Sequence, residues 1–150
     1  MKPTPAGWPR MSGSVYYDDP RAAIDWLVRA FGFEVRLLVE GDGGTIAHSE
    51  LTYGEGLLMV GGTGGEQPYQ ARYRSPKSVG GVTQALAIFV DDVDAHCARA
   101  VAAGAQLLRE PTTSDYGDDY WTDRSYGALD PEGHLWWFMQ RLRGPAERAP

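Results

Sequence analysis

Two side chains capable of acid/base chemistry alternate along one segment of the sequence. His48 and Glu50 lie within residues 45–53, which have the composition of a strand that returns from a glycine-rich hairpin loop. Successive side chains of a strand point to opposite faces, so this pair projects from one face. The pair is suited to acid/base catalysis or to two positions of a metal site. The polar outer face of a hairpin is the alternative interpretation. Tyr126, in a later predicted strand, is the third acid/base candidate.

A second group of candidates is aromatic and precedes that later strand. Tyr120 and Trp121 supply flat contact area, and Arg124 can hold a carboxylate or phosphate through two hydrogen bonds. The loop also contains Asp118, Asp119 and Asp123, which are alternative partners for the guanidinium. We expect ligand contact here because the loop leads into a strand that would line a cavity.

The last predicted strand contains the strongest candidate for ligand contact. It follows the turn 130–133, Asp-Pro-Glu-Gly, and reads Leu-Trp-Trp-Phe-Met over residues 135–139. Alternation places Trp137 on one face, with Trp136 and Phe138 on the other. One face can pack on a helix, and the other must then face a second buried space, either a core or a ligand cavity. If Trp137 faces the cavity, Trp136 and Phe138 pack under the helix.

The elements that position these residues occur twice in the same order. Each half is predicted to contain a strand, a helix that begins at an Asp-Asp pair and ends at a glycine, and three further strands. The predicted strands are 14–17, 34–40, 45–53 and 57–60, then 85–90, 106–110, 121–129 and 134–140. The boundaries follow as an N-terminal arm (1–13), a first βαβββ module (14–61), a glycine- and proline-rich linker (62–81), a second βαβββ module (82–140) and a C-terminal tail (141–150).

This repeat predicts an α+β fold. One module is too small to bury both faces of its own sheet. Two modules can join their sheets into a cup-shaped, eight-stranded mixed sheet with the helices outside. The inside of the cup would then be the cavity.

The chain resembles the vicinal oxygen chelate superfamily, also described as glyoxalase, bleomycin-resistance and dioxygenase proteins. Three motifs carry the resemblance, and the order of elements matches over about residues 14–140. They are Tyr17-Asp18-Asp19-Pro20 with Ala30-Phe31-Gly32-Phe33, Val90-Asp91-Asp92-Val93-Asp94 with Ala103-Gly104-Ala105, and Asp130-Pro131-Glu132-Gly133-His134. The resemblance implies this fold and a homodimer, but it does not specify a reaction, because one fold hosts many functions.

Metal-dependent members of that superfamily place four His, Gln or Glu ligands in the cup. The resemblance carries these positions to Ser12, to Met59 or Val60, to Ala85 and to Trp137. Apart from Gln84, which neighbours Ala85, no competent ligand for a divalent ion stands there. We therefore expect no metal and no other cofactor in the cup, and expect Met59 and Trp137 to contact a ligand instead.

Composition narrows the range of partners. The net charge is −6 without a basic run, which disfavours nucleic acid as a partner. Cys97 is the single cysteine, and we found no segment typical of a signal peptide or a membrane span. We expect a cytoplasmic protein without a membrane partner.

The function predicted from these observations is metal-free binding of a small organic molecule in an aromatic-lined cup, with an aromatic molecule favoured by the tryptophans. The alternative is an enzyme of the same superfamily, a lyase, isomerase or dioxygenase. Such an enzyme would use acid/base residues in the cavity or an atypical metal site. A third possibility is a protein-binding member whose cup is filled by its own side chains. The sequence leaves open whether catalysis occurs, and for an enzyme it favours a glyoxalase-like lyase.

Overall fold

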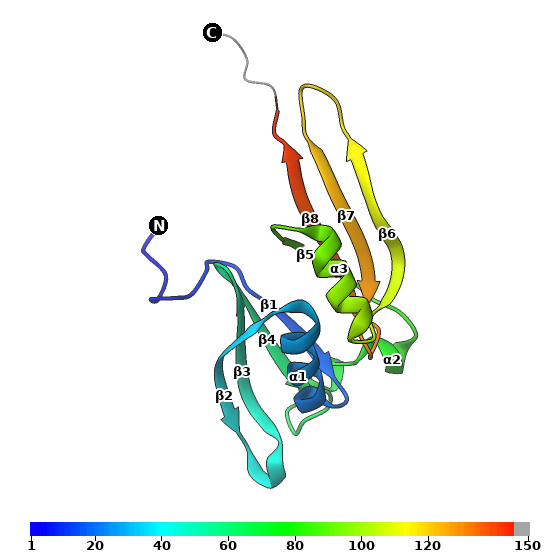
Figure 1. Cartoon of the computed structure of the whole chain (residues 1–150). Coiled ribbons are helices and arrows are strands. Elements are labelled where there is room, and N and C mark those ends of the chain that lie inside the picture. The colour runs from blue at the N-terminus through cyan, green and yellow to red at the C-terminus, as the bar shows by residue number, and fades with distance from the viewer. Residues whose placement is uncertain (146–150) are drawn as a thin grey trace. The chain divides into compact units, whose positions relative to one another are not determined.

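Each half of the chain folds into a four-stranded mixed sheet with one main helix against it (Figure 1). The computed structural model describes residues 1–145, and the chain divides into two compact units, residues 1–81 and residues 82 onward. The predicted α+β class and the two βαβββ modules are confirmed. The single cup remains a prediction.

The first module contains one helix and four strands. Its strand order is β1-β4-β3-β2, with β1 parallel to β4 and the other neighbours antiparallel. The elements are β1 (Gly13–Tyr17), α1 (Pro20–Phe31), β2 (Glu34–Glu40), β3 (Ile46–Tyr53) and β4 (Gly56–Gly62), with a 3-10 turn, η1 (Asp42–Gly44), between β2 and β3.

The second module repeats this topology. Its strand order is β5-β8-β7-β6, and β5 runs parallel to β8. The elements are β5 (Ala85–Phe89), α3 (Val93–Ala102), β6 (Gln106–Asp115), β7 (Thr122–Leu129) and β8 (Leu135–Arg143). None of the helices among the described residues is both long and apolar enough to cross a membrane.

Both main helices begin where the Asp-Asp pairs predict. The Asp19 carboxylate accepts a hydrogen bond from the Ala22 amide at 3.0 Å, and Asp92 accepts one from the Ala95 amide at 2.9 Å. Each carboxylate thereby satisfies an amide that lacks a partner within the first helical turn. Helix α1 ends at Gly32, whose φ of 83° is the left-handed conformation that glycine adopts without steric cost.

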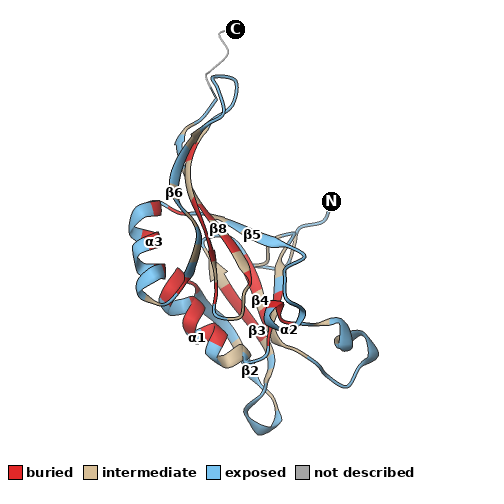
Figure 2. Cartoon of the chain, turned by 90° about the vertical axis from the view of Figure 1, so that its right-hand side faces the viewer, coloured by how far each residue is buried: buried red, intermediate tan, exposed pale blue. Residues whose placement is uncertain are grey.

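The core of each module lies between its helix and one face of its sheet (Figure 2). Apolar residues at helical spacing predict an inner stripe in each helix, and both stripes need correction. The predicted members are Ala23, Ile24, Leu27, Val28 and Phe31 in α1, and Val93, Cys97, Ala100 and Val101 in α3. Trp26 is buried, although it was not assigned to the stripe, whereas Val28 is 39% exposed. In α3, Val101 is 46% exposed and His96 is buried, the reverse of the expected arrangement. A large aromatic side chain reaches the core from the margin of a helical stripe more readily than valine does.

The turn before β8 is organised by one buried carboxylate. Asp130 Oδ1 accepts hydrogen bonds from the amides of Glu132 and His134, both at 3.0 Å. Its second oxygen, Oδ2, accepts a hydrogen bond from Trp136 Nε1 at 3.0 Å. The acidic residue of the turn motif therefore fixes both the turn and the first aromatic residue of the strand that follows.

Three segments differ from the predicted boundaries. The linker contains η2 (Pro68–Arg72) and α2 (Pro76–Val79), where we expected irregular structure. Strand β6 continues through Pro111 to Asp115, because an edge strand tolerates a residue without an amide hydrogen. Strand β8 includes residues 141–143 of the expected tail, and residues 146–150 of that tail lie outside the described residues.

Candidate ligand-binding site

The first sheet presents its candidate residues on the face opposite α1. In β1 and β4, Val15 pairs with Val60 and both are buried, so alternation turns Ser14 and Met59 to the other face. In β3, the buried Ser49 hydroxyl donates to the Val60 carbonyl at 2.6 Å and accepts from the Val60 amide at 2.9 Å. We call the side opposite α1 the open face of the first sheet.

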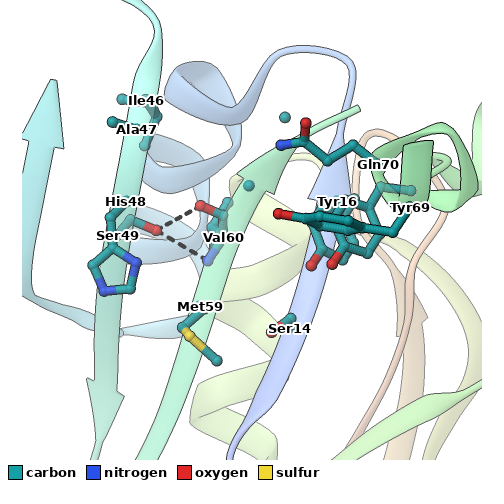
Figure 3. Close-up of a pocket in the computed structure, with 13 residues that line it drawn as sticks. Ser14, Tyr16, Ile46, Ala47, His48, Ser49, Met59, Val60, Tyr69 and Gln70 are labelled. Atoms are coloured by element: carbon teal, nitrogen blue, oxygen red, sulfur yellow. Dashed lines mark hydrogen bonds between the residues drawn. The ribbon is translucent and has the colours of Figure 1, made fainter. Parts of the chain in front are cut away.

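A pocket of about 360 Å³ lies on this open face (Figure 3). Residues of β1, β3 and β4 line it together with residues of the linker segment η2 and the tyrosine that follows. The lining side chains include Ser14, Tyr16, His48, Met59, Tyr69 and Tyr73. Its volume is within the range of small-molecule sites.

Stacked tyrosine rings form one wall of the pocket. The rings of Tyr16 and Tyr73 lie 3.9 Å apart at an interplanar angle of 9°, and Tyr69 meets Tyr73 edge-on at 6.0 Å. Gly61 leaves room for this arrangement, because a Cβ there would lie 3.0 Å from the Tyr16 ring. Burial and a hydrogen bond with Tyr73 raise the pKa of Tyr16 to about 12. The Tyr16 hydroxyl therefore remains protonated at neutral pH.

Three charged or polar side chains form a chain beside the pocket. His48 Nε2 lies 3.0 Å from Glu50 Oε1, and the other Glu50 oxygen lies 3.4 Å from Arg36 Nε. The Glu50 side chain is 7% exposed, compared with 42% for His48. Arg36 also donates to the carbonyl of Gly7 at 2.5 Å, and its guanidinium lies 5.8 Å from the Trp8 ring. The N-terminal arm thus contacts the far end of this chain.

The second sheet has an aromatic face opposite α3. Trp136 and Phe138 are fully buried on the helix side, with Phe138 4.2 Å from the His96 ring, which confirms the predicted facing of β8. Trp137 lies half-buried on the other side, directly over Gly127, where a Cβ would come within 2.9 Å of its ring. The absence of a side chain on Gly127 thus lets the indole lie against β7.

Trp121 lies on the same aromatic face, where the Arg141 guanidinium contacts its ring. The Arg141 guanidinium lies 4.9 Å from the Trp121 ring and 5.3 Å from the Phe89 ring. Asp123 forms an ion pair with Arg141 and fixes it. Tyr120 meets Trp121 edge-on at 6.0 Å and is 56% exposed.

The structure does not bring two of the predicted site residues to the face of Trp137. Arg124 forms two hydrogen bonds, of 2.8 Å and 2.7 Å, with Asp94 on α3 and so lies on the helix side. These bonds raise the pKa of Arg124 and lower the pKa of Asp94. Tyr126 is buried under α3, where its hydroxyl lies 2.7 Å from His96 Nδ1. Even-numbered residues of β7 face the helix, so neither side chain lies on the face of Trp137.

The positions that correspond to the superfamily's metal ligands do not fit a divalent metal. The side chains of Val60, Ala85 and Trp137 have no donor atom for one, Met59 offers only a soft thioether, and Ser12 only a neutral hydroxyl. Among residues 1–145, no three His, Cys, Asp or Glu side chains lie close enough together to hold an ion.

Sequence reasoning missed several residues of the pocket. Tyr69, Gln70 and Tyr73 belong to the linker, which we predicted only as a glycine- and proline-rich connection between the modules, and Arg36 reaches the open face at a register shift in β2. Two tyrosines spaced four residues apart in a glycine-rich linker were the available signal, because helical spacing places such side chains on one face.

Comparison with known proteins identifies the class. Residues 11–138 match the model of the Glyoxalase/Bleomycin resistance protein/Dioxygenase superfamily, and the chain belongs to this family. An uncharacterized protein of Mycobacterium bovis is 31% identical over 135 residues, which cover 90% of this chain and 85% of that protein.

Solved structures agree with this assignment. The crystal structure of TioX from Micromonospora sp. ML1 is 36% identical, covers 89% of this chain and 100% of its own, and superposes with a TM-score of 0.68. A glyoxalase/bleomycin resistance protein/dioxygenase family enzyme from Burkholderia phytofirmans PsJN is 20% identical, with coverage of 87% and 98% and a TM-score of 0.63. The latter likeness concerns the fold alone.

Proposed function

We propose that this superfamily member binds a small planar aromatic molecule, without a metal and without chemical turnover. The observation that carries the proposal is the pocket of the first module. Its wall is a flat stack of tyrosine rings, and Met59 stands where a metal-binding relative would have a ligand. Because Tyr16 already stacks on an aromatic ring from its own chain, this surface is suited to stacking a planar ligand.

The aromatic face of the second module gives independent support. Trp137 and Trp121 present indole rings on the side of the sheet away from α3, and Arg141 lies between Trp121 and Phe89. An indole ring can stack on a ligand, but it cannot polarise a carbonyl group as a metal does. Both modules therefore present surfaces suited to binding rather than to Lewis-acid catalysis.

A thermal-shift screen tests the proposal. The panel contains planar aromatic compounds, including aromatic antibiotics, together with small oxo-acids and divalent metals. A ligand present at a hundred times its Kd stabilises the native state by about 2.7 kcal/mol, which raises the melting temperature measurably. We expect aromatic compounds to stabilise the protein and metals to have no effect.

Two matched variants of the linker test whether a compound found in the screen binds at the pocket of the first module. Tyr73→Leu removes the stacked ring, whereas Val79→Ala changes an exposed side chain of the same linker that does not line the pocket. We expect the first variant to alter the affinity for a hit and the second to leave it unchanged. A screen in which only metals stabilise the protein would contradict the proposal.

The second candidate function is metal-free acid/base catalysis. It is favoured by the contact between the half-exposed His48 ring at the pocket and the buried Glu50 carboxylate, because a carboxylate that orients an imidazole is a common arrangement in enzymes. Turnover of a bound compound, followed by chromatography and lost in His48→Gln, would favour this candidate over binding alone.

A further inference from the structure

The chain from Arg36 through Glu50 to His48 ends at the pocket. Glu50 lies almost completely buried between a cation and an imidazole. Burying a carboxylate without partners is costly, and here each oxygen of Glu50 lies near a partner, Arg36 on one side and His48 on the other. An ionised carboxylate can only accept hydrogen bonds, so the proton between the two groups must belong to His48 Nε2.

This arrangement selects one tautomer of the neutral imidazole. With its proton on Nε2, His48 has an unprotonated Nδ1, which is an acceptor. The ring lines the pocket on the open face of the first sheet (Figure 3). The stacked tyrosine wall lines the same pocket, so one ligand can contact both the tyrosine rings and the His48 ring.

We propose that His48 Nδ1 accepts a hydrogen bond from a hydroxyl group of the ligand. The pocket therefore selects hydroxylated aromatic compounds over their aryl ethers. This inference rests on the proposed function and adds the ligand class to it. The hydroxyl hydrogen bonds to Nδ1, and for an acidic phenol the proton passes to that nitrogen. The O–H bond breaks, the N–H bond forms, and the electron pair stays on the phenolate oxygen beside the resulting imidazolium.

In this arrangement Glu50 is a positioning residue. Its carboxylate fixes the tautomer of His48 and stabilises the imidazolium that forms. Arg36 lies 3.4 Å from the other oxygen of the carboxylate, and the contacts of the arm residues Gly7 and Trp8 keep Arg36 in place. Of Arg36, Glu50 and His48, only His48 lines the pocket and can accept a proton from a ligand.

The probes are 4-nitrophenol and 4-nitroanisole, which differ by a methyl group on the oxygen. We expect the intact protein to bind 4-nitrophenol at least about tenfold more tightly than 4-nitroanisole, since one hydrogen bond that involves a charged group contributes about that factor. The absorption band of bound 4-nitrophenol should also show more phenolate than the free compound at the same pH. Equilibrium dialysis and absorption spectroscopy measure the two effects.

Three variants separate the roles. His48→Gln should abolish the preference and the extra phenolate, and it should remain folded because the side chain is half-exposed and not part of the core. Glu50→Gln should reduce both effects and change the His48 tautomer, which ring-nitrogen NMR reports independently of any ligand. Val79→Ala, which changes an exposed linker residue outside the pocket, should leave the preference unchanged.

Each outcome decides the inference. Equal binding of the two probes by the intact protein would overturn it while leaving aromatic binding as a function. If the preference survives in His48→Gln, another group causes the preference, and the inference is also overturned. Binding of neither probe would reject the ligand class, and the wider screen would then decide the proposed function separately.

Discussion

Single side chains in this protein have different roles according to the face of the sheet on which they lie. Trp136 and Trp137 are adjacent in β8, yet one is fully buried against Asp130 and the other lies half-buried over Gly127. The period of two in a strand explains the difference. The consequences of substitution should therefore differ as sharply as the environments do.

Trp136→Ala should lower the free energy of unfolding by about 3–5 kcal/mol, because it leaves a large cavity and removes the donor to Asp130. Trp137→Ala should cost less stability and should instead weaken the binding of any aromatic compound that stabilises the protein in a screen. Denaturant titration and ligand titration measure the two effects. An exchange of the two phenotypes would show that our assignment of ligand contact to Trp137 is wrong.

Tyr16 should give the protein a pH dependence at the alkaline end. Its pKa is raised from an ordinary value of 10 to about 12 in the folded state, so the protonated phenol favours folding. This contribution is complete below pH 10 and is lost as the pH rises through about 12. Tyr16→Phe should remove one tyrosine from the part of an absorption titration that lies near pH 12. An unchanged titration curve would argue against the hydrogen bond with Tyr73.

The helices depend on local capping that is equivalent in the two modules. Asp19→Ala and Asp92→Ala should each lower the free energy of unfolding by about 1 kcal/mol, since each removes one side-chain hydrogen bond to an otherwise unpaired amide. Urea denaturation of the two single variants tests this, with Asp91→Ala as a neighbouring control. A loss below a few tenths of a kcal/mol would mean that water replaces the cap.

Elements specified by nearby residues were predictable from the sequence, and contacts between distant segments were not. The Asp-Asp caps, the helix end at Gly32 and the alternation of His48 with Glu50 follow from spacing alone. The stack of Tyr73 on Tyr16 depends on how the linker returns across the sheet. The pairing of Arg124 with Asp94 likewise depends on packing between elements that are distant in the sequence.

At the scale of the whole molecule, two similar modules each have one covered and one open sheet face. Sequence alone indicated this duplication, because the capping pairs and helix-ending glycines recur at matched positions. Each sheet also ends in an edge strand, β2 in the first module and β6 in the second. Exposed edges with apolar side chains favour association with another chain.

We propose that the protein is a homodimer in solution and that β2 contributes to the interface. Val35, Leu37 and Val39 on this edge strand are 45%, 42% and 42% exposed.

Val39→Lys should shift the protein towards the monomer, because a charge on the edge opposes pairing. Val28→Lys, a similarly exposed valine on α1, is the matched control for the added charge. Light scattering at micromolar concentration should give twice the chain mass for the intact protein and the control. A monomer mass for the intact protein would reject the dimer, and a dimer that survives Val39→Lys would exclude β2.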